Sequence, residues 1–215
     1  MRRSKAKVLF LAETKISLSE HRSKTLVAPG QTSYVVVTDN TAYASRYDMI
    51  ACCSSERVFP PIVYSPEDRK DLDVKGLRKC MLLNYINDIL AQAIGAIDKY
   101  PLILVMDGSN VHSTTEILEA FHEVGCQDLE TVYIMPTKSA KRLSPLDNSL
   151  FHEWKERVRS HDILTKSNVK QIMCDEWNTF SADDLIMHYR NCGLMNNIDP
   201  YFDCPDPSNH RHPRP

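Results

Sequence analysis

The sequence predicts an α/β fold with one mixed sheet, in which an antiparallel meander is followed by parallel strands and helices flank the sheet. Short apolar or β-branched runs predict strands at residues 7–11, 34–38 and 48–53, and a turn-forming segment separates the last two. A strongly periodic stretch predicts a helix over about 73–98. After it, a strand–helix–strand order with short connections predicts a right-handed crossover between parallel strands.

The elements of the second half follow from local signals. Residues 102–106 are apolar at consecutive positions, which is typical of a strand buried on both faces. The next helix has Ser113 or Thr114 as its cap and Gly125 at its end. The remaining predictions are a strand at 131–135, a basic loop from Pro136 to Pro145, a helix over 148–159, and amphipathic helices near 167–178 and 182–191.

Length and composition limit the kinds of protein this can be. The 215 residues suit one domain over 1–195, followed by a poorly ordered tail over 196–215 that is rich in Pro and Asp. No apolar run reaches the roughly 18 residues of a membrane helix. Seven irregularly spaced cysteines favour reduced thiols over a disulfide framework. With a net charge of −2, any nucleic-acid role must rest on local patches or on a partner.

Two aspartates are the candidates for chemistry. Asp107 follows a buried strand, at the edge where open α/β sheets place their ligand crevices, and Asp147 begins a later helix. Carboxylates from two segments at one sheet edge can share divalent cations, because Mg²⁺ prefers hard oxygen ligands. Each aspartate also has a purely structural interpretation, Asp107 as a turn residue before Gly108 and Asp147 as a helix N-cap.

Three blocks occur in order along the chain: LFLAET at 9–14, LVMDGSNVH at 104–112 and LSPLDNSLFHEWKERV at 143–158. Together with the segment 169–193, they resemble the acidic blocks and closing helices of DDE-superfamily transposases, specifically the mariner/pogo group. The resemblance implies an RNase H-like fold over nearly the whole chain. It also implies that Asp107 and Asp147 are catalytic ligands of two Mg²⁺ or Mn²⁺ ions, used to cut phosphodiester bonds.

Ala12 stands where the resemblance places the first catalytic Asp, in a block that reads Ala-Glu-Thr instead of Asp-Glu-Thr. An alanine cannot ligate a metal, and Glu13 is not expected to replace the lost ligand because neighbouring strand side chains point to opposite faces. We therefore predict a cleavage-deficient chain. A deliberate substitution is the favoured explanation, although natural decay of a domesticated element would look the same.

The third block departs from the family pattern at its start. Ser144 precedes Pro145 where Gln-Pro is commoner, while Leu146 and Asp147 still fit, so Asp147 is the predicted last ligand. Glu153 is the runner-up for that role.

Nucleic-acid contacts are predicted at Lys138, Lys141 and Arg142, which crowd the loop before the third block. His112, in the second block, could orient a phosphate or a water, or could cap the helix that begins near Thr114. The two tryptophans, Trp154 and Trp177, are expected in the core. A zinc site is not expected from the irregularly spaced residues Cys192, Cys204, His210 and His212.

We therefore expect the catalytic domain of a metal-dependent DNA endonuclease or transposase, inactive as it stands. DNA is the expected partner and the nucleus the expected location; a homodimer is compatible with the resemblance, whereas a membrane or small-molecule cofactor is not expected. The alternative is a domesticated, non-catalytic remnant that binds DNA or protein, as a nuclear regulator or as a secreted effector in a host nucleus. A third possibility is cleavage of RNA or an RNA–DNA hybrid. No helix-turn-helix module is expected before residue 7.

Overall fold

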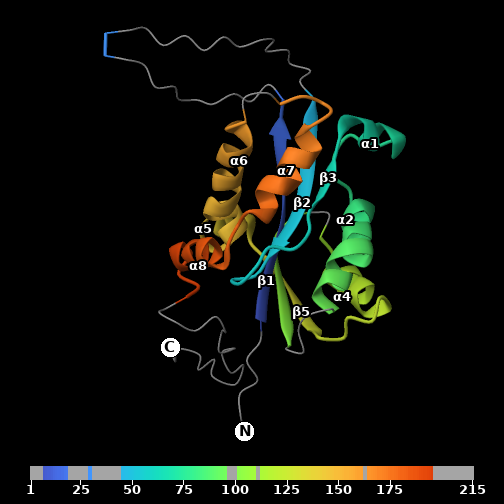
Figure 1. Cartoon of the computed structure of the whole chain (residues 1–215). Coiled ribbons are helices and arrows are strands. Elements are labelled where there is room, and N and C mark those ends of the chain that lie inside the picture. The colour runs from blue at the N-terminus through green and yellow to red at the C-terminus, as the bar shows by residue number, and fades with distance from the viewer. Residues whose placement is uncertain are drawn as a thin grey trace.

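A five-stranded mixed sheet lies at the centre of the protein (Figure 1). The computed structural model describes residues 7–18, 29–30, 45–95, 101–109, 112–161 and 164–195. The spatial order of the strands is β3-β2-β1-β4-β5. Their bounds are Lys7–Ser17 for β1, Arg46–Cys53 for β2, Ile62–Tyr64 for β3, Leu102–Asp107 for β4 and Leu129–Met135 for β5.

The central strand, β1, joins an antiparallel half of the sheet to a parallel half. It pairs antiparallel with β2, which pairs antiparallel with β3, and it pairs parallel with β4, which pairs parallel with β5. The predicted antiparallel-then-parallel sheet is therefore confirmed. Its third antiparallel strand is Ile62–Tyr64, which the sequence analysis missed, and the predicted strand at 34–38 lies outside the described residues.

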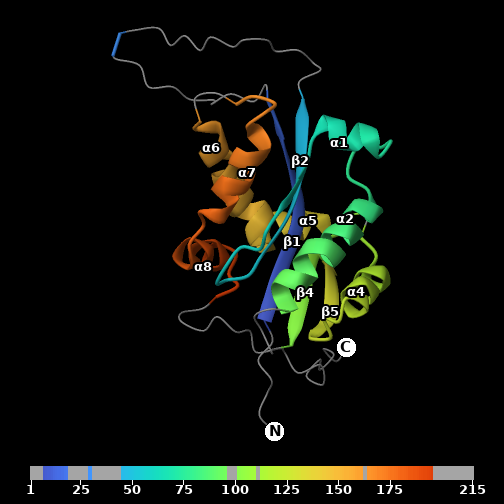
Figure 2. The ribbon, with the colours of Figure 1, turned by 45° about the vertical axis from the view of Figure 1, so that its right-hand side comes forward.

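Helices cover both faces of the sheet (Figures 1 and 2). One face carries α2, η1, α3 and α4, whose apolar side chains form a core with Leu9 and Leu11 of β1. The other face carries α5, η2, α6, α7 and α8, which pack on Phe10 and Ile16. The bounds are α1 Pro66–Asp71, α2 Lys79–Tyr85, η1 Ile86–Leu90, α3 Ala91–Gly95, α4 Thr114–Glu123, α5 Thr137–Leu143, η2 Leu146–Leu150, α6 Phe151–Arg159, α7 Val169–Asn178 and α8 Ala182–Asn191.

The long helix predicted over 73–98 begins six residues too early, because the structure starts α2 at Lys79. A separate short helix, α1, ends at its C-cap Leu72, and Asp73 then takes a positive φ of 52° that breaks the helical path. Apolar periodicity cannot detect such an interruption. The start of α1 was readable, however, because Ser65 and Asp68 form a capping box around Pro66.

The basic segment before the third block was predicted to be a loop, and that prediction is wrong. Residues Thr137–Leu143 form α5, which is anchored by the buried Ala140 and carries Lys141 and Arg142 in its last turn. Pro136 and Pro145 lie outside this seven-residue helix. Proline breaks a helix only when it falls inside it, so the two prolines are compatible with α5. The predicted tail over 196–215 lies outside the described residues.

The two tryptophans belong to the core, as predicted. Both side chains are fully buried, and each indole N–H donates to a backbone carbonyl: Trp154 to Met173 at 3.0 Å and Trp177 to Phe59 at 2.9 Å. A buried indole therefore keeps a hydrogen-bond partner in both cases. In the part of the chain that the structure describes, every helix is too short or too polar to cross a membrane.

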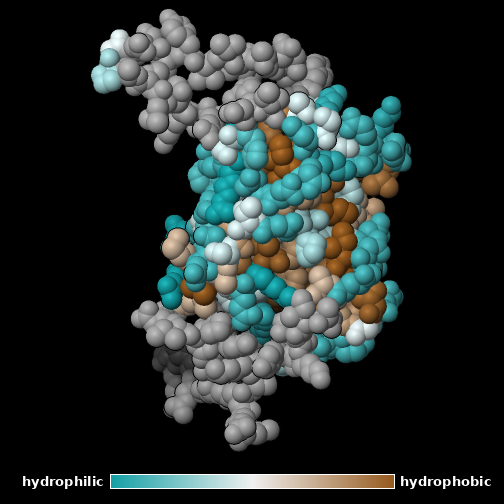
Figure 3. All heavy atoms as spheres, viewed as in Figure 1, coloured by the Kyte–Doolittle hydropathy of each residue, from teal (hydrophilic) through white to brown (hydrophobic). Residues whose placement is uncertain are grey.

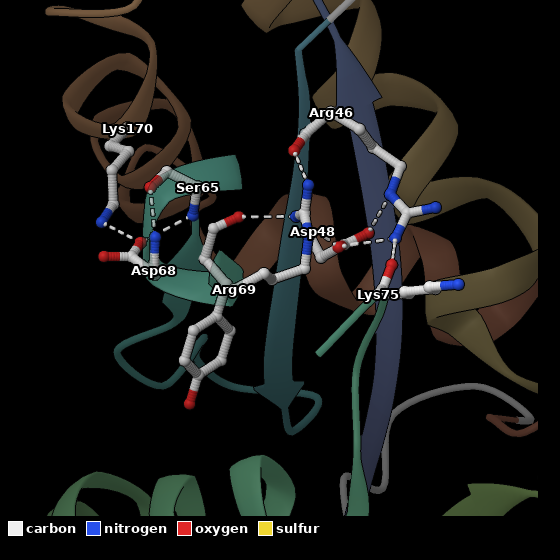
Figure 4. A network of polar contacts seen from close by, with 8 residues as sticks. Arg46, Asp48, Ser65, Asp68, Arg69, Lys75 and Lys170 are labelled. Carbon is white, nitrogen blue, oxygen red and sulfur yellow. Dashed lines mark hydrogen bonds and ion pairs between the residues drawn. The ribbon is translucent and has the colours of Figure 1, made fainter. Parts of the chain in front are cut away.

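A network of charged side chains joins α1 to the sheet edge (Figure 4). The buried Arg69 places Nη1 2.6 Å from Asp48 Oδ2, and its Nη2 donates to the Arg46 carbonyl at 2.8 Å. On the other side of α1, Lys170 of α7 donates to Asp68 at 2.7 Å. The helices α1 and α7 are thus tied together beside β3.

The surface on the side of Figure 3 is mostly hydrophilic, with apolar side chains in separate patches. Leu72, which ends α1 and is 50% exposed, is one of the exposed apolar residues. Isolated exposure of this kind is normal for a folded domain.

Candidate active site

The strand register places Ala12 beside Asp107. The last residue pair between β1 and β4 is Phe10 with Val105, and two residues further along each strand lie Ala12 and Asp107. Side chains at alternate positions share a face, so Ala12 and Asp107 lie on the face that carries α5 to α8. Ala12 is buried there, in the same core as Phe10.

Asp147 reaches the same region from η2. Leu146 and Leu150 are buried against this face of the sheet, and Asp147 between them is exposed. The Ser144 hydroxyl accepts a hydrogen bond from the Asp147 N–H at 3.3 Å. Ser144 therefore caps this turn, and the interpretation of Asp147 as an N-cap is wrong.

The pKa of the Asp147 carboxyl shows that the acidic residues have come together. Loss of hydration near the protein surface raises this pKa, and although the Ser144 hydroxyl lowers it, the negative charges of Asp107 and Glu13 raise it further. The net effect is a raised pKa. Asp107, Asp147 and Glu13, from three elements, thus share one electrostatic environment.

His112 links two of these acids from inside the protein. Its side chain is completely buried, with Nε2 2.7 Å from Glu13 Oε1 and Nδ1 2.8 Å from the Asp107 carbonyl oxygen. Nδ1 also lies 3.3 Å from Asp107 Oδ1. Burial by itself would lower the His112 pKa, but its contacts with Asp107 and Glu13 outweigh that effect and raise the pKa to about 10.

The position of His112 contradicts one of the two roles predicted for it. The residue that caps α4 is Ser113, whereas the role of His112 toward a phosphate or a water stays a prediction. In the structure the His112 ring is a cationic bridge between Glu13 and Asp107. The three residues offer ligand atoms within 4.8 Å of one another, but each carboxylate faces a different ring nitrogen.

Glu13 is the site residue that the sequence analysis set aside. The prediction that it points away from Ala12 agrees with strand geometry, because it follows Leu9 and Leu11 on the opposite face of β1. Its side chain nevertheless reaches His112 at the end of that face. The available signal was the acidic residue retained inside the Ala-Glu-Thr block.

The predicted phosphate-binding residues flank this cluster. Lys138, Lys141 and Arg142 are all exposed on α5. Thr137 donates to the Gly108 carbonyl at 3.4 Å, and Asn148 donates to the Arg142 carbonyl at 2.9 Å, so α5 spans from the end of β4 to η2.

Gly108 permits this close packing. A Cβ at position 108 would lie 3.3 Å from the Met135 carbonyl oxygen, so a larger residue would push the end of β4 away from β5 and α5. The basic helix and the acidic cluster are therefore held at the same edge of the sheet.

Glu153, the runner-up ligand, is directed elsewhere. Its Oε1 accepts from Arg157 at 2.5 Å, and its Oε2 lies 3.1 Å from His188 Nε2. Cys192 is buried, while the other three zinc-capable residues of the sequence lie outside the described residues.

Several solved structures share this fold. The Mos1 strand transfer complex contains a chain with a TM-score of 0.60 and 14% identity, covering 87% of this chain and 51% of that one. A chain of the Mos1 mariner paired-end complex with Mn has a TM-score of 0.61 and 14% identity, and the match covers 87% of this chain and 52% of that one. The catalytic domain of Mos1 mariner transposase has a TM-score of 0.55 and 13% identity, and the match covers 87% of this chain and 76% of that one.

These similarities define the fold but no more, because the identities are low. The mixed five-stranded sheet with helices on both faces matches the RNase H-like fold of the Mos1 catalytic domain, as predicted. The chain spans about half the length of the proteins in the Mos1 complexes. No curated protein sequence matches it.

The family comes from a separate observation. The sequence profile described as DDE superfamily endonuclease matches residues 76–192, more than half of the chain. The matched segment includes Asp107 and Asp147 but begins after Ala12 and Glu13. With this profile match, the RNase H-like sheet and two aspartates brought together at its edge, the chain belongs to the DDE superfamily of endonucleases.

Proposed function

We propose that this chain is the catalytic domain of a metal-dependent DNA endonuclease or transposase that is cleavage-deficient because Ala12 occupies the place of its first metal ligand. One observation carries the proposal. The register puts a buried alanine beside Asp107, on the face from which Asp147 also approaches, so the chain has two of three acidic positions filled.

The residues present fit a hard divalent cation. Asp107 Oδ1 is buried and has no hydrogen-bond partner among the described residues, and Asp147 has a raised pKa because the other acids are close. Together with Glu13, these two acids place three carboxylates near a single cationic group, His112, so the described part of the site carries an excess of negative charge. Oxygen donors of this kind suit Mg²⁺ or Mn²⁺, and related Mos1 paired-end complexes were solved with Mg and with Mn.

Asp107 and Asp147 would hold the ions, with the third carboxylate at position 12 in the intact enzyme. Divalent ions held there would supply activation of a water or hydroxyl and stabilisation of the leaving oxygen. His112 fixes the end of β4 by donating its two ring N–H groups to the Asp107 carbonyl and the Glu13 carboxylate. The methyl group of Ala12 supplies no donor atom, which removes one ligand from the site.

DNA is the proposed substrate, with phosphate contacts from Lys138, Lys141 and Arg142. These exposed cations lie on the helix that borders the acidic cluster, and phosphate contacts of this type orient the strand without reading its sequence. A homodimer is proposed with the same activity, since similar proteins were solved as paired-end complexes. A nuclear location is proposed because DNA is the proposed substrate.

The test is to restore the missing carboxylate. The Ala12→Asp variant should nick supercoiled plasmid in Mn²⁺, whereas the chain with Ala12 should not. The matched control combines Ala12→Asp with Asp107→Asn and should be inactive, which excludes a contaminating nuclease. The proposal is refuted if a folded Ala12→Asp variant stays inactive while a control nuclease is active in the same assay.

A non-catalytic DNA- or protein-binding domain, acting as a nuclear regulator or effector, is the second candidate. The observation in its favour is that Ala12 is 3% exposed and packs in the core, so the structure has closed over the position without a carboxylate. An alanine codon at position 12 in the source gene, with DNA binding by the chain that persists in EDTA, would favour this candidate.

A further inference from the structure

A buried histidine on α8 contacts the turn that carries Asp147. His188 is 4% exposed, and its Nδ1 lies 2.6 Å from Ser149 Oγ in a hydrogen bond. Its Nε2 lies 3.1 Å from Glu153 Oε2, as an ion-pair contact. Ser149 is two residues after Asp147 in η2, and Glu153 lies one turn further, in α6.

The two ring nitrogens make contacts of different kinds. Nδ1 shares a hydrogen bond with the Ser149 hydroxyl, whereas Nε2 lies 3.1 Å from the Glu153 carboxylate without hydrogen-bond geometry. Glu153 is in turn held by Arg157, whose Nη2 donates to Oε1. The buried His188 therefore contacts two consecutive helical segments, η2 through Ser149 and α6 through Glu153.

The helix that carries His188 is itself tied to the sheet. The neighbouring Tyr189 is buried, donates its hydroxyl to the Cys53 carbonyl at 3.3 Å and packs edge-on against Phe10, with ring centroids 5.5 Å apart. Ser181 and Asp184 form a capping box that fixes the start of α8. Phe10 is on β1 and Cys53 on β2, so α8 is positioned relative to the strand that bears Ala12.

The turn that carries Asp147 needs such support. In η2 the Phe151 N–H donates to the Leu146 carbonyl, five residues earlier, so this stretch is a π-helical turn instead of a regular α-helix. Leu146 and Leu150 fix its buried side. The Ser149–His188 contact fixes a second side and leaves Asp147 directed toward the acidic cluster.

We infer that His188 is a positioning residue, which holds η2 against α8 and thereby sets the separation of Asp147 from Asp107. This inference rests on the proposed function, because it takes Asp147 as a metal ligand. In this inference α8 connects the sheet to η2. Tyr189 contacts β2, and His188 contacts Ser149 beside Asp147.

The experiment measures Mn²⁺ affinity from the spectroscopic signal of free Mn²⁺, in the full chain. Outer residues that orient a ligand typically change metal affinity by about 10–100-fold when replaced, so His188→Ala and Ser149→Ala should each weaken binding by about 10-fold. His188→Asn can place a polar atom near the position of Nδ1 and should recover most of the affinity. A merely structural role would not predict that recovery.

Controls separate this inference from the proposed function. His161→Ala removes another histidine–glutamate pair, with Glu176 at 2.7 Å, two residues beyond the end of α6, and should leave the affinity unchanged. Asp147→Ala shows how much Mn²⁺ affinity is lost when the proposed ligand itself is removed. If only the Ala12→Asp chain binds Mn²⁺, all variants are compared in that background. If Asp147→Ala has no effect on the affinity, or neither the parent nor Ala12→Asp binds Mn²⁺, the proposed function fails and the inference with it.

If Asp147→Ala weakens binding while the variants at His188 and Ser149 bind like the parent, the inference alone is overturned. Ser149→Ala, which removes one partly exposed hydroxyl, keeps the test decisive if His188→Ala does not fold. In that case a normal affinity of Ser149→Ala would overturn the inference.

Discussion

Replacing Ala12 by Asp is expected to make the stability of the domain depend on divalent cations. Ala12 is 3% exposed, and Asp107 is its neighbour on the adjacent strand. A new carboxylate at this position would be buried beside an existing negative charge and would have no cation to neutralise it. The substitution should therefore destabilise the protein in EDTA.

The size of the effect follows from the burial. An uncompensated buried charge costs about 3–5 kcal/mol, which is a large part of the roughly 5–15 kcal/mol that stabilises an ordinary domain. For a chain of this length, each 1 kcal/mol shifts Tm by about 2–4 °C, so Tm should fall by about 10 °C. Mn²⁺ at 100 times its Kd would restore about 2.7 kcal/mol, because it binds only the folded state.

The assay is thermal unfolding of each variant in EDTA and in Mn²⁺. Ala51→Asp is a matched control, because Ala51 pairs directly with Ala12, is equally buried, and lies one strand further from Asp107. It should be destabilised in both conditions. If Mn²⁺ stabilises Ala12→Asp no more than Ala51→Asp, position 12 is not a ligand position and the reasoning from the strand register is refuted.

Three further predictions concern other parts of the structure. Reversing charge at Lys141 and Arg142 together should weaken DNA binding and reduce its dependence on salt, by about 0.9 in the log–log slope per lost phosphate contact, as measured in a salt titration; an unchanged slope would exclude α5 from the interface. The raised pKa of His112, about 10, means that its contribution is complete below its ordinary value of 6.5 and disappears as pH rises through 10. Urea unfolding at pH 7 and 10 should therefore show a loss of stability that His112→Gln lacks, and equal losses in both proteins would contradict this. Arg69→Ala leaves the buried Asp48 without its 2.6 Å partner and should cost about 3–5 kcal/mol in the same assay, whereas a cost below 1 kcal/mol would mean that Arg46 suffices.

Much of the fold was predictable because its signals are local. The consecutive apolar residues of β4, the caps of α4 and the periodicity of α6, α7 and α8 each occur within a few residues of sequence. Two errors were also local. The capping box of α1 is a sequence signal for that helix, whereas α5 gives a weak helical signal because Ala140 is its one buried residue among exposed charges.

The site was only half predictable. Asp107 and Asp147 follow recognisable segments, and the structure brings them together, although their role as metal ligands stays a prediction. The contact between His112 and Glu13 joins residues 99 positions apart. No spacing rule links such residues, because the contact depends on how far β1 extends beyond the end of β4.

The sequence by itself determined the strands β1, β2, β4 and β5, the two aspartates and the alanine that interrupts the acidic series, because residue identity and local periodicity are properties of the chain. Only the tertiary structure decided which acids share a site and what holds them there. The register of β1 and β4 puts Ala12 beside Asp107, the buried His112 ring brings in Glu13, and α8 fixes the turn of Asp147 through His188. The physical reason is that burial and charge pairing depend on three-dimensional distance, which separation along the sequence does not encode.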